Sequence, residues 1–104
     1  METKSKIISF IGLAKKAAKL SIGKDATYES ILENTAELIL FSSDLSTRSI
    51  NDVEKAAFKR NVKTLMTNIS MSDYEQVLNK KAGIICIKDS GFAKKIQMLC
   101  EIQE

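Results

Sequence analysis

The chain has 104 residues, 44% hydrophobic and 28% charged, a composition typical of one folded domain over residues 1–104 and not of a disordered segment. With two cysteines and no histidine, it lacks the usual zinc ligands and the commonest general base, so no metal, cofactor or catalytic residue is expected. The net charge of +3 is uneven, with a basic start, an acidic middle and a basic end, which fits either a cationic surface that attracts phosphate groups or an ordinary charged surface.

The first predicted element is a helix over residues 4–20. From Ile7 onward its apolar residues recur every three or four positions, and Lys15, Lys16 and Lys19 lie together on the other face. These lysines also interrupt the apolar residues near the N-terminus, so no secretion signal is expected. The longest apolar runs, residues 38–41 and 83–87, are too short for a membrane span. The protein is therefore expected in the cytoplasm.

A hinge at residues 20–25, with the sequence LSIGKD, follows the lysines. Gly23 permits a turn, and a second helix is predicted to begin at Lys24 or Asp25 and to end near Asn34. The first N–H groups of such a helix have no partner within it, so a ligand that is anionic or accepts hydrogen bonds could bind there. An ordinary helix start is the alternative interpretation.

Further strands and helices alternate beyond the hinge. Residues 36–41 and 83–87 are nearly continuous apolar runs, typical of strands buried on both faces, and residues 62–66 form a weaker strand. A serine, threonine or aspartate stands where each remaining helix would begin. The first of these helices is predicted from Ser46 or Thr47 to about Arg60, with Asn61 as its stop. The second is predicted from Ser70 or Ser72 to Leu78, and the third from Asp89 or Ser90 through Leu99.

Strands that alternate with helices imply crossover connections, which predict a small, mostly parallel sheet in a three-layer α/β/α sandwich. The chain contains no G-x-G-x-x-G and no G-x-x-x-x-G-K-[ST] phosphate loop. Its two buried strands end instead in polar turns at residues 42–44 and 88–90. We interpret the serines and aspartates of these turns as helix N-caps, with a binding role as the alternative.

Several segments together resemble the bacterial YlxQ-type proteins of the ribosomal protein L7Ae/L30e superfamily. They are LAKKAAKL followed by SIG at residues 13–23, the strand at 36–41 with Ser43 and Asp44, and the strand at 84–87 with DSGFA at residues 89–93. The resemblance implies an L30e-like sandwich and a non-catalytic, ribosomal-protein-like RNA-binding protein. Its expected partner is structured RNA, a kink-turn or a related internal loop, in a ribonucleoprotein such as the ribosome. Neither DNA nor a membrane is an expected partner.

In that superfamily the start of the second helix, after the hinge glycine, and the loop before the last buried strand contact the RNA. The resemblance implies that a glycine lets the two backbones approach, that free N–H groups meet acceptors on the RNA, and that lysines neutralise its charge. Asn79 stands where the family usually has a glycine, and an asparagine can adopt the left-handed conformation. The implied contact residues are Gly23, Lys24, Asp25 and Tyr28 at the helix start and Asn79, Lys80 and Lys81 in the loop, with Lys15 and Lys19 adding positive charge.

An alternative function follows from three positions after the hinge glycine. The strongest kink-turn readers have asparagine, glutamate and, further along, lysine where this chain has Asp25, Ala26 and Glu29. An ionised Asp25 cannot donate a hydrogen bond to a guanine edge, and Glu29 places an anion near phosphates. The alternative is therefore a protein-interaction module that keeps the fold with a weakened RNA surface.

Overall fold

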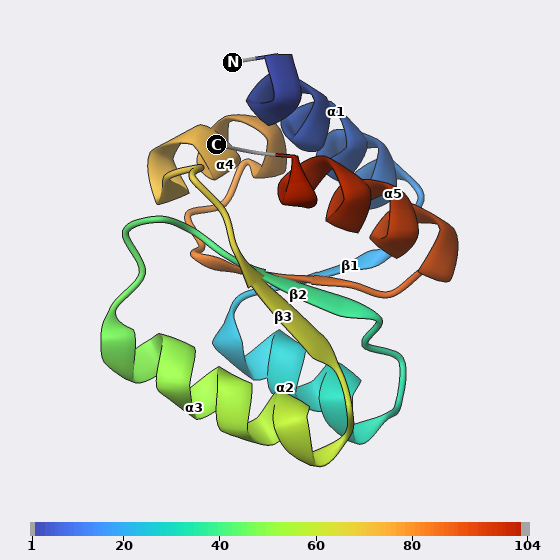
Figure 1. Ribbon diagram of the computed structural model, residues 1–104, viewed down its shortest axis with the longest axis vertical. Coiled ribbons are helices and arrows are strands. Elements are labelled where there is room, and N and C mark those ends of the chain that lie inside the picture. Colours follow the sequence, from blue (N-terminus) through green and yellow to red (C-terminus); the bar gives the residue numbers. More distant parts are fainter. Residues whose placement is uncertain (1, 103–104) are drawn as a thin grey trace.

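The computed structural model describes residues 2–102, in which helices alternate with the strands of one sheet (Figure 1). The elements are, in chain order, α1 (Glu2–Lys16), β1 (Leu20–Ile22), α2 (Lys24–Leu32), β2 (Leu38–Phe41), α3 (Thr47–Lys59), β3 (Lys63–Met66), α4 (Met71–Leu78), β4 (Ile84–Ile87) and α5 (Ser90–Glu101).

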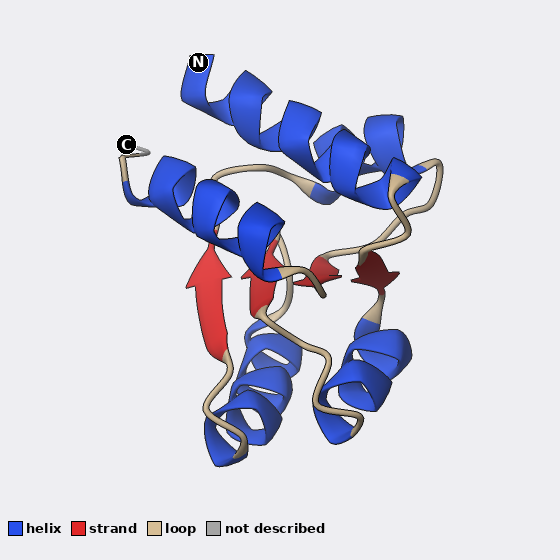
Figure 2. Ribbon diagram, turned by 90° about the vertical axis from the view of Figure 1, so that its right-hand side faces the viewer, coloured by secondary structure: helices blue, strands red, loops and turns tan. Residues whose placement is uncertain are grey.

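The sheet separates two layers of helices, as predicted for an α/β/α sandwich. Helices α1, α4 and α5 cover one face, and α2 and α3 cover the other (Figures 1 and 2). In β2, Leu38 and Leu40 pack under the first layer, whereas Ile39 and Phe41 pack under the second. All residues of β2 and β4 are buried. The prediction of strands buried on both faces is therefore confirmed, because each face has its own apolar cover.

The predicted direction of the strands is wrong, because the sheet is mixed and not mostly parallel. Its strand order is β1-β4-β2-β3; β2 and β3 are parallel, but β4 is antiparallel to both β1 and β2. Phe41 pairs with Met66 at the end of β3 and with Ile84 at the start of β4. The chain thus enters β4 at the end of the sheet where it left β3, so the connection through α4 does not return it to the opposite end and β4 runs antiparallel to β2.

The hinge contains a strand that the sequence did not predict. Leu20, Ser21 and Ile22 pair with Ile87, Cys86 and Ile85 of β4. The predicted first helix accordingly ends at Lys16, and Ala18 adopts a left-handed φ of 59° in the turn that follows. Three half-buried residues are too few to show the alternation by which a strand is recognised.

The predicted N-caps of α3, α4 and α5 are confirmed, whereas the predicted end of the first helix is wrong. The backbone N–H groups of Ser49, Asp73 and Phe92 donate to the side chains of Ser46, Ser70 and Asp89, which are the N-caps of α3, α4 and α5. Helix α2 differs, because its N-cap is Gly23, which has no side chain to offer. At the other ends, Asn34, Asn61 and Asn79 have φ near 60°, the left-handed conformation that stops a helix.

Candidate nucleic-acid interface

The start of α2 lies beside the start of β4. The backbone N–H of Gly23 donates to the carbonyl of Ile84 over 2.9 Å, and Gly23 has a φ of 100°, which only glycine adopts without strain. The carbonyl of Gly23 accepts the N–H of Thr27, so the helix is hydrogen-bonded from its first turn. The N–H groups of that turn itself have no partner within the helix and lack a side-chain cap.

The loop before β4 approaches the same edge of the sheet. Asn79 ends α4 with φ 56° and ψ 29°, and its N–H donates to the carbonyl of Glu75, so the predicted left-handed conformation is confirmed. Lys80 and Lys81 follow as exposed residues. The ammonium of Lys15, at the end of α1, donates to the carbonyl of Leu78 over 2.6 Å. The structure thus brings Lys15 and the lysines of this loop to the edge where Gly23 begins α2.

The other predicted contact residues on α2 are divided among its faces. The Lys24 ammonium lies 3.0 Å from a carboxylate oxygen of Asp52 on α3, and this hydrogen bond lowers the pKa of Asp52. Tyr28 is half-buried against α3, in a shallow hollow that also includes Ala56. Asp25 is exposed. The role of Asp52 was not predicted, since nothing in the sequence pairs it with a residue 28 positions earlier.

Lys19 is the predicted contact residue that lies apart from the others. Its carbonyl accepts the N–H of Lys88, at the end of β4, whereas Gly23 is bonded to Ile84, at the start of β4. The three residues of β1 therefore separate Lys19 from the hinge glycine, by about 13 Å at the usual rise per residue. The sequence predicted a helix up to this point, which would have placed Lys15, Lys16 and Lys19 together on one face.

The polar turn after β2 forms a hydrogen bond to α4 and not to α3, the next helix in the chain. Asp44 accepts a hydrogen bond from the backbone N–H of Met71, at the start of α4, over 3.0 Å. This bond is the main cause that lowers the pKa of Asp44, and the charge of Lys81 lowers it further. The N-cap interpretation is therefore wrong for Asp44, because the N-caps of α3 and α4 are Ser46 and Ser70, and Asp44 instead binds the first turn of α4 from a loop 27 residues earlier.

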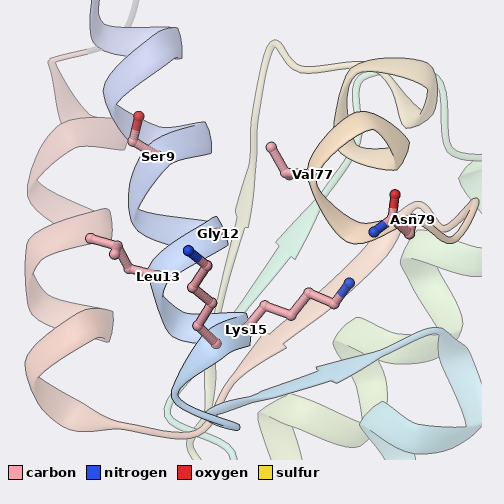
Figure 3. Close-up of a pocket in the computed structure, with 7 residues that line it drawn as sticks. Ser9, Gly12, Leu13, Lys15, Val77 and Asn79 are labelled. Carbon is pink, nitrogen blue, oxygen red and sulfur yellow. The ribbon is translucent and has the colours of Figure 1, made fainter.

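A cleft lies between α1 and the end of α4, beside the same loop (Figure 3). Its volume is about 610 Å³, within the range of small-molecule sites. The residues that line it are Ser9, Gly12, Leu13, Lys15, Lys16, Val77 and Asn79. The sequence did not predict this cleft, because it needs the crossing of two helices that are more than fifty residues apart.

Within residues 2–102, no group of three or more histidine, cysteine, aspartate or glutamate residues is arranged to hold a metal ion. The two cysteines are free thiols, and burial raises the pKa of Cys86 and of Cys100 to about 11. Both thiols therefore stay protonated at neutral pH and act as small apolar side chains. None of the described helices is both long and apolar enough to traverse a lipid bilayer.

The bond between Lys15 and Leu78 is expected to stabilise the loop at residues 79–81. The last carbonyls of a helix lack partners and carry its negative dipole end, so an ammonium there is favourable. Lys15→Met keeps the aliphatic stem and removes the donor. We expect a loss of about 1 kcal/mol in the free energy of unfolding, measured by urea denaturation, and faster hydrogen exchange in the loop. Lys16→Met is the matched control, and equal losses in both variants would contradict this role.

Comparisons with known proteins agree with the predicted resemblance. No protein-family model matches the chain. It is 29% identical over 98 residues to the RNA-binding protein YlxQ of Enterococcus faecium, a match that covers 94% of each chain. Among solved structures, a Bacillus halodurans protein of unknown function aligns with a TM-score of 0.86 at 21% identity, over 92% of this chain and 97% of that one.

A second solved structure, the Giardia lamblia 15.5kD RNA binding protein, aligns with a TM-score of 0.76 at 10% identity, over 97% of this chain and 87% of that one. At such identities the two structures show a shared fold, whereas the similarity to YlxQ extends to the sequence. The chain is therefore similar in sequence to YlxQ over most of its length, and it shares its α/β/α fold with both solved structures.

Proposed function

We propose that this protein binds structured RNA, without catalysing a reaction on it, through the edge of the sheet where α2 and β4 begin. The observation that carries the proposal is the hydrogen bond from Gly23 to Ile84, which holds the uncapped start of α2 beside the lysine-bearing loop. The name of the relative YlxQ, an RNA-binding protein, supports the same function.

The edge has the chemistry that phosphate groups and base edges require. Free N–H groups at a helix start donate to oxygen acceptors, and the positive end of the dipole favours anions. Gly23 has no side chain to hold an RNA backbone away, and a Cβ built there meets nothing within 4 Å. Lys80 and Lys81 are exposed beside it and can neutralise phosphates.

The charges on α2 limit the direction from which RNA approaches. Asp25 and Glu29 are exposed one helical turn apart, on a face that repels phosphates. Lys15 and Lys80 lie on the side of α1 and α4. The RNA therefore approaches from that side, with its backbone over the loop at residues 79–81 and away from the outer face of α2.

The proposed ligand is a kink-turn or a related internal loop, as in ribosomal RNA, because its sharp bend offers phosphates and base edges from two strands at one place. We place this activity in the cytoplasm, because the free thiols of Cys86 and Cys100 fit a reducing environment. We also propose that the protein acts on a ribonucleoprotein such as the ribosome.

Titration with a kink-turn RNA and with a straight duplex of equal length, at two salt concentrations, tests the proposal. We expect a preference for the kink-turn that persists at the higher salt, because shape-dependent contacts are screened less than phosphate contacts. Equal, strongly salt-dependent binding to both RNAs would contradict shaped recognition. In that case, a protein partner captured after nuclease treatment would favour the protein-interaction module.

A further inference from the structure

The outer face of the layer formed by α2 and α3 carries two rows of opposite charge. Asp25 and Glu29 are exposed four positions apart, so they share one face of α2. Arg48, Lys55 and Lys59 are exposed at spacings of seven and four positions, so they share one face of α3. None of these five side chains belongs to a salt bridge between residues 2–102. The layer thus presents an acidic row beside a basic row.

The two helices run in the same direction, and their contacts fix which residues are level with one another. Lys24, in the first turn of α2, is paired with Asp52 on α3. Arg60, at the end of α3, donates to the carbonyl of Leu32, at the end of α2. Both contacts join residues 28 positions apart, so the helices are parallel and in register over the length of α2. Glu29 is accordingly level with the stretch of α3 between Lys55 and Lys59.

An apolar hollow of about 290 Å³ lies between the two rows. Tyr28 and Leu32 line it from α2, and Ala56 lines it from α3. Leu32 is 67% exposed and Phe58, also on α3, is 83% exposed, although both side chains are large and apolar. No other element of the described chain covers this side of the layer (Figures 1 and 2). Exposed apolar residues with charged residues around them are typical of a protein interface.

We propose that this face binds the same face of a second copy of the chain. The twofold axis runs along the hollow, so that α2 of each copy lies over α3 of the other. The acidic row of each copy then meets the basic row of the other, and Glu29 lies opposite Lys55 and Lys59 of the second copy at two symmetric places. A second copy turned end for end would place α2 over α2, with acid against acid. The charges therefore select the parallel arrangement.

A second copy suits this face because the two rows make it complementary to itself. This inference goes beyond the proposed RNA binding and does not depend on it. The loop at residues 79–81 lies on the side of α1 and α4, so the dimer leaves it free. Because α2 and α3 begin at the same end of the sheet, both RNA-binding edges lie at the same end of the dimer. The dimer thus offers two RNA sites side by side, and Asp25 and Glu29, which repel phosphates, bind the second copy instead.

Sedimentation equilibrium over a series of protein concentrations is the first test. We expect the mass of the wild type to rise from the 11.6 kDa of one chain toward twice that value, with a dissociation constant in the micromolar range, as for other small interfaces. High salt should weaken the association, because the two rows attract each other through charges at the rim. A wild type that stays at the mass of one chain up to millimolar concentration would overturn the proposal.

An exchange of charge between the two rows is the second test. In the homodimers of Glu29→Lys and of Lys59→Glu, like charges face each other at two places, so each variant should have a dissociation constant raised about tenfold or more. An equal mixture of the two variants should associate like the wild type, because one contact then has both charges reversed and the other has neither. Circular dichroism checks that each variant is folded, and recovery in the mixture shows the same.

Glu75→Lys and Lys94→Glu are the matched controls. They make the same changes of charge at exposed positions of α4 and α5, on the opposite layer, and should associate like the wild type. Equal weakening by the controls would show an effect of net charge alone and overturn the interface. Weakened variants that do not recover when mixed would overturn the facing rows and the proposal with them.

Failure of the dimer and failure of the proposed function have different signatures. A monomeric wild type that prefers the kink-turn RNA to the straight duplex overturns the dimer and leaves the proposed function in place. A wild type that dimerises and recovers as described, but shows no such preference, overturns kink-turn recognition and supports the dimer.

Discussion

Lys24→Glu combined with Lys80→Glu is expected to lower the affinity for the kink-turn RNA at least about a hundredfold, because two cations at the proposed interface become anions. The two residues flank the contact, one at the start of α2 and the other in the loop before β4. The dependence of the binding constant on salt should also become shallower. Fluorescence anisotropy at several salt concentrations measures both effects.

The fold of this double variant should be unaffected. Lys80 is exposed, and Lys24 forms a surface ion pair with Asp52, a kind of pair that contributes little to stability. A glutamate in the first turn of α2 also interacts favourably with the helix dipole. The matched control is Lys6→Glu with Lys94→Glu, which makes the same change in net charge at exposed positions of α1 and α5. Equal loss of binding in both double variants would show that only net charge matters and would remove the assigned interface.

Gly83→Val is expected to reduce the free energy of unfolding by about 3 kcal/mol, because the position has no room for a side chain. A Cβ there would lie 2.8 Å from the Ser42 hydroxyl oxygen, 2.9 Å from a methyl group of Leu45 and 3.3 Å from Cγ of Met71. The carbonyl of Gly83 also accepts the N–H of Ser42 over 2.9 Å, a bond that a displaced backbone would weaken.

Urea denaturation measures this loss, and Gly12→Ala provides a control of opposite sign. The alanine methyl group meets nothing within 4 Å and improves a helix interior, so we expect a gain of about 0.5–1 kcal/mol. A Gly83→Val variant within about 1 kcal/mol of the wild type would show that the packing at Ser42 relaxes easily, since a typical overpacked substitution costs more. In that case, we would also expect the Gly83→Val substitution not to displace the loop at residues 79–81.

Much of the secondary structure could be predicted, because the interactions that determine it are local. The caps of Ser46, Ser70 and Asp89 each join residues three positions apart, and the left-handed stop at Asn79 depends on that residue and the turn before it. The two buried strands are recognisable by apolar residues alone. The resemblance to YlxQ-type proteins, which the comparisons confirm, rests on the same local segments.

The errors concern the relation between distant segments. Strand β1 exists because Leu20 to Ile22 find a partner in β4, and β4 is antiparallel because the connection through α4 stays at one end of the sheet. Asp44 looks like a cap for α3 and instead accepts a hydrogen bond from Met71, in the first turn of α4. For the candidate site, the contact residues at the hinge and in the loop come from the family resemblance and remain a prediction, whereas the pairing of Lys24 with Asp52 was not foreseen.

The sequence by itself therefore determined the starts of α3, α4 and α5, the two buried strands, the layered fold and the resemblance to YlxQ, because each depends on spacing within a few residues. Tertiary structure alone decided the strand directions, the separation of Lys19 from the hinge, and the cleft over Gly12. The physical reason is that connection lengths and the packing of helices on the sheet choose which distant residues meet, and no local pattern records that choice.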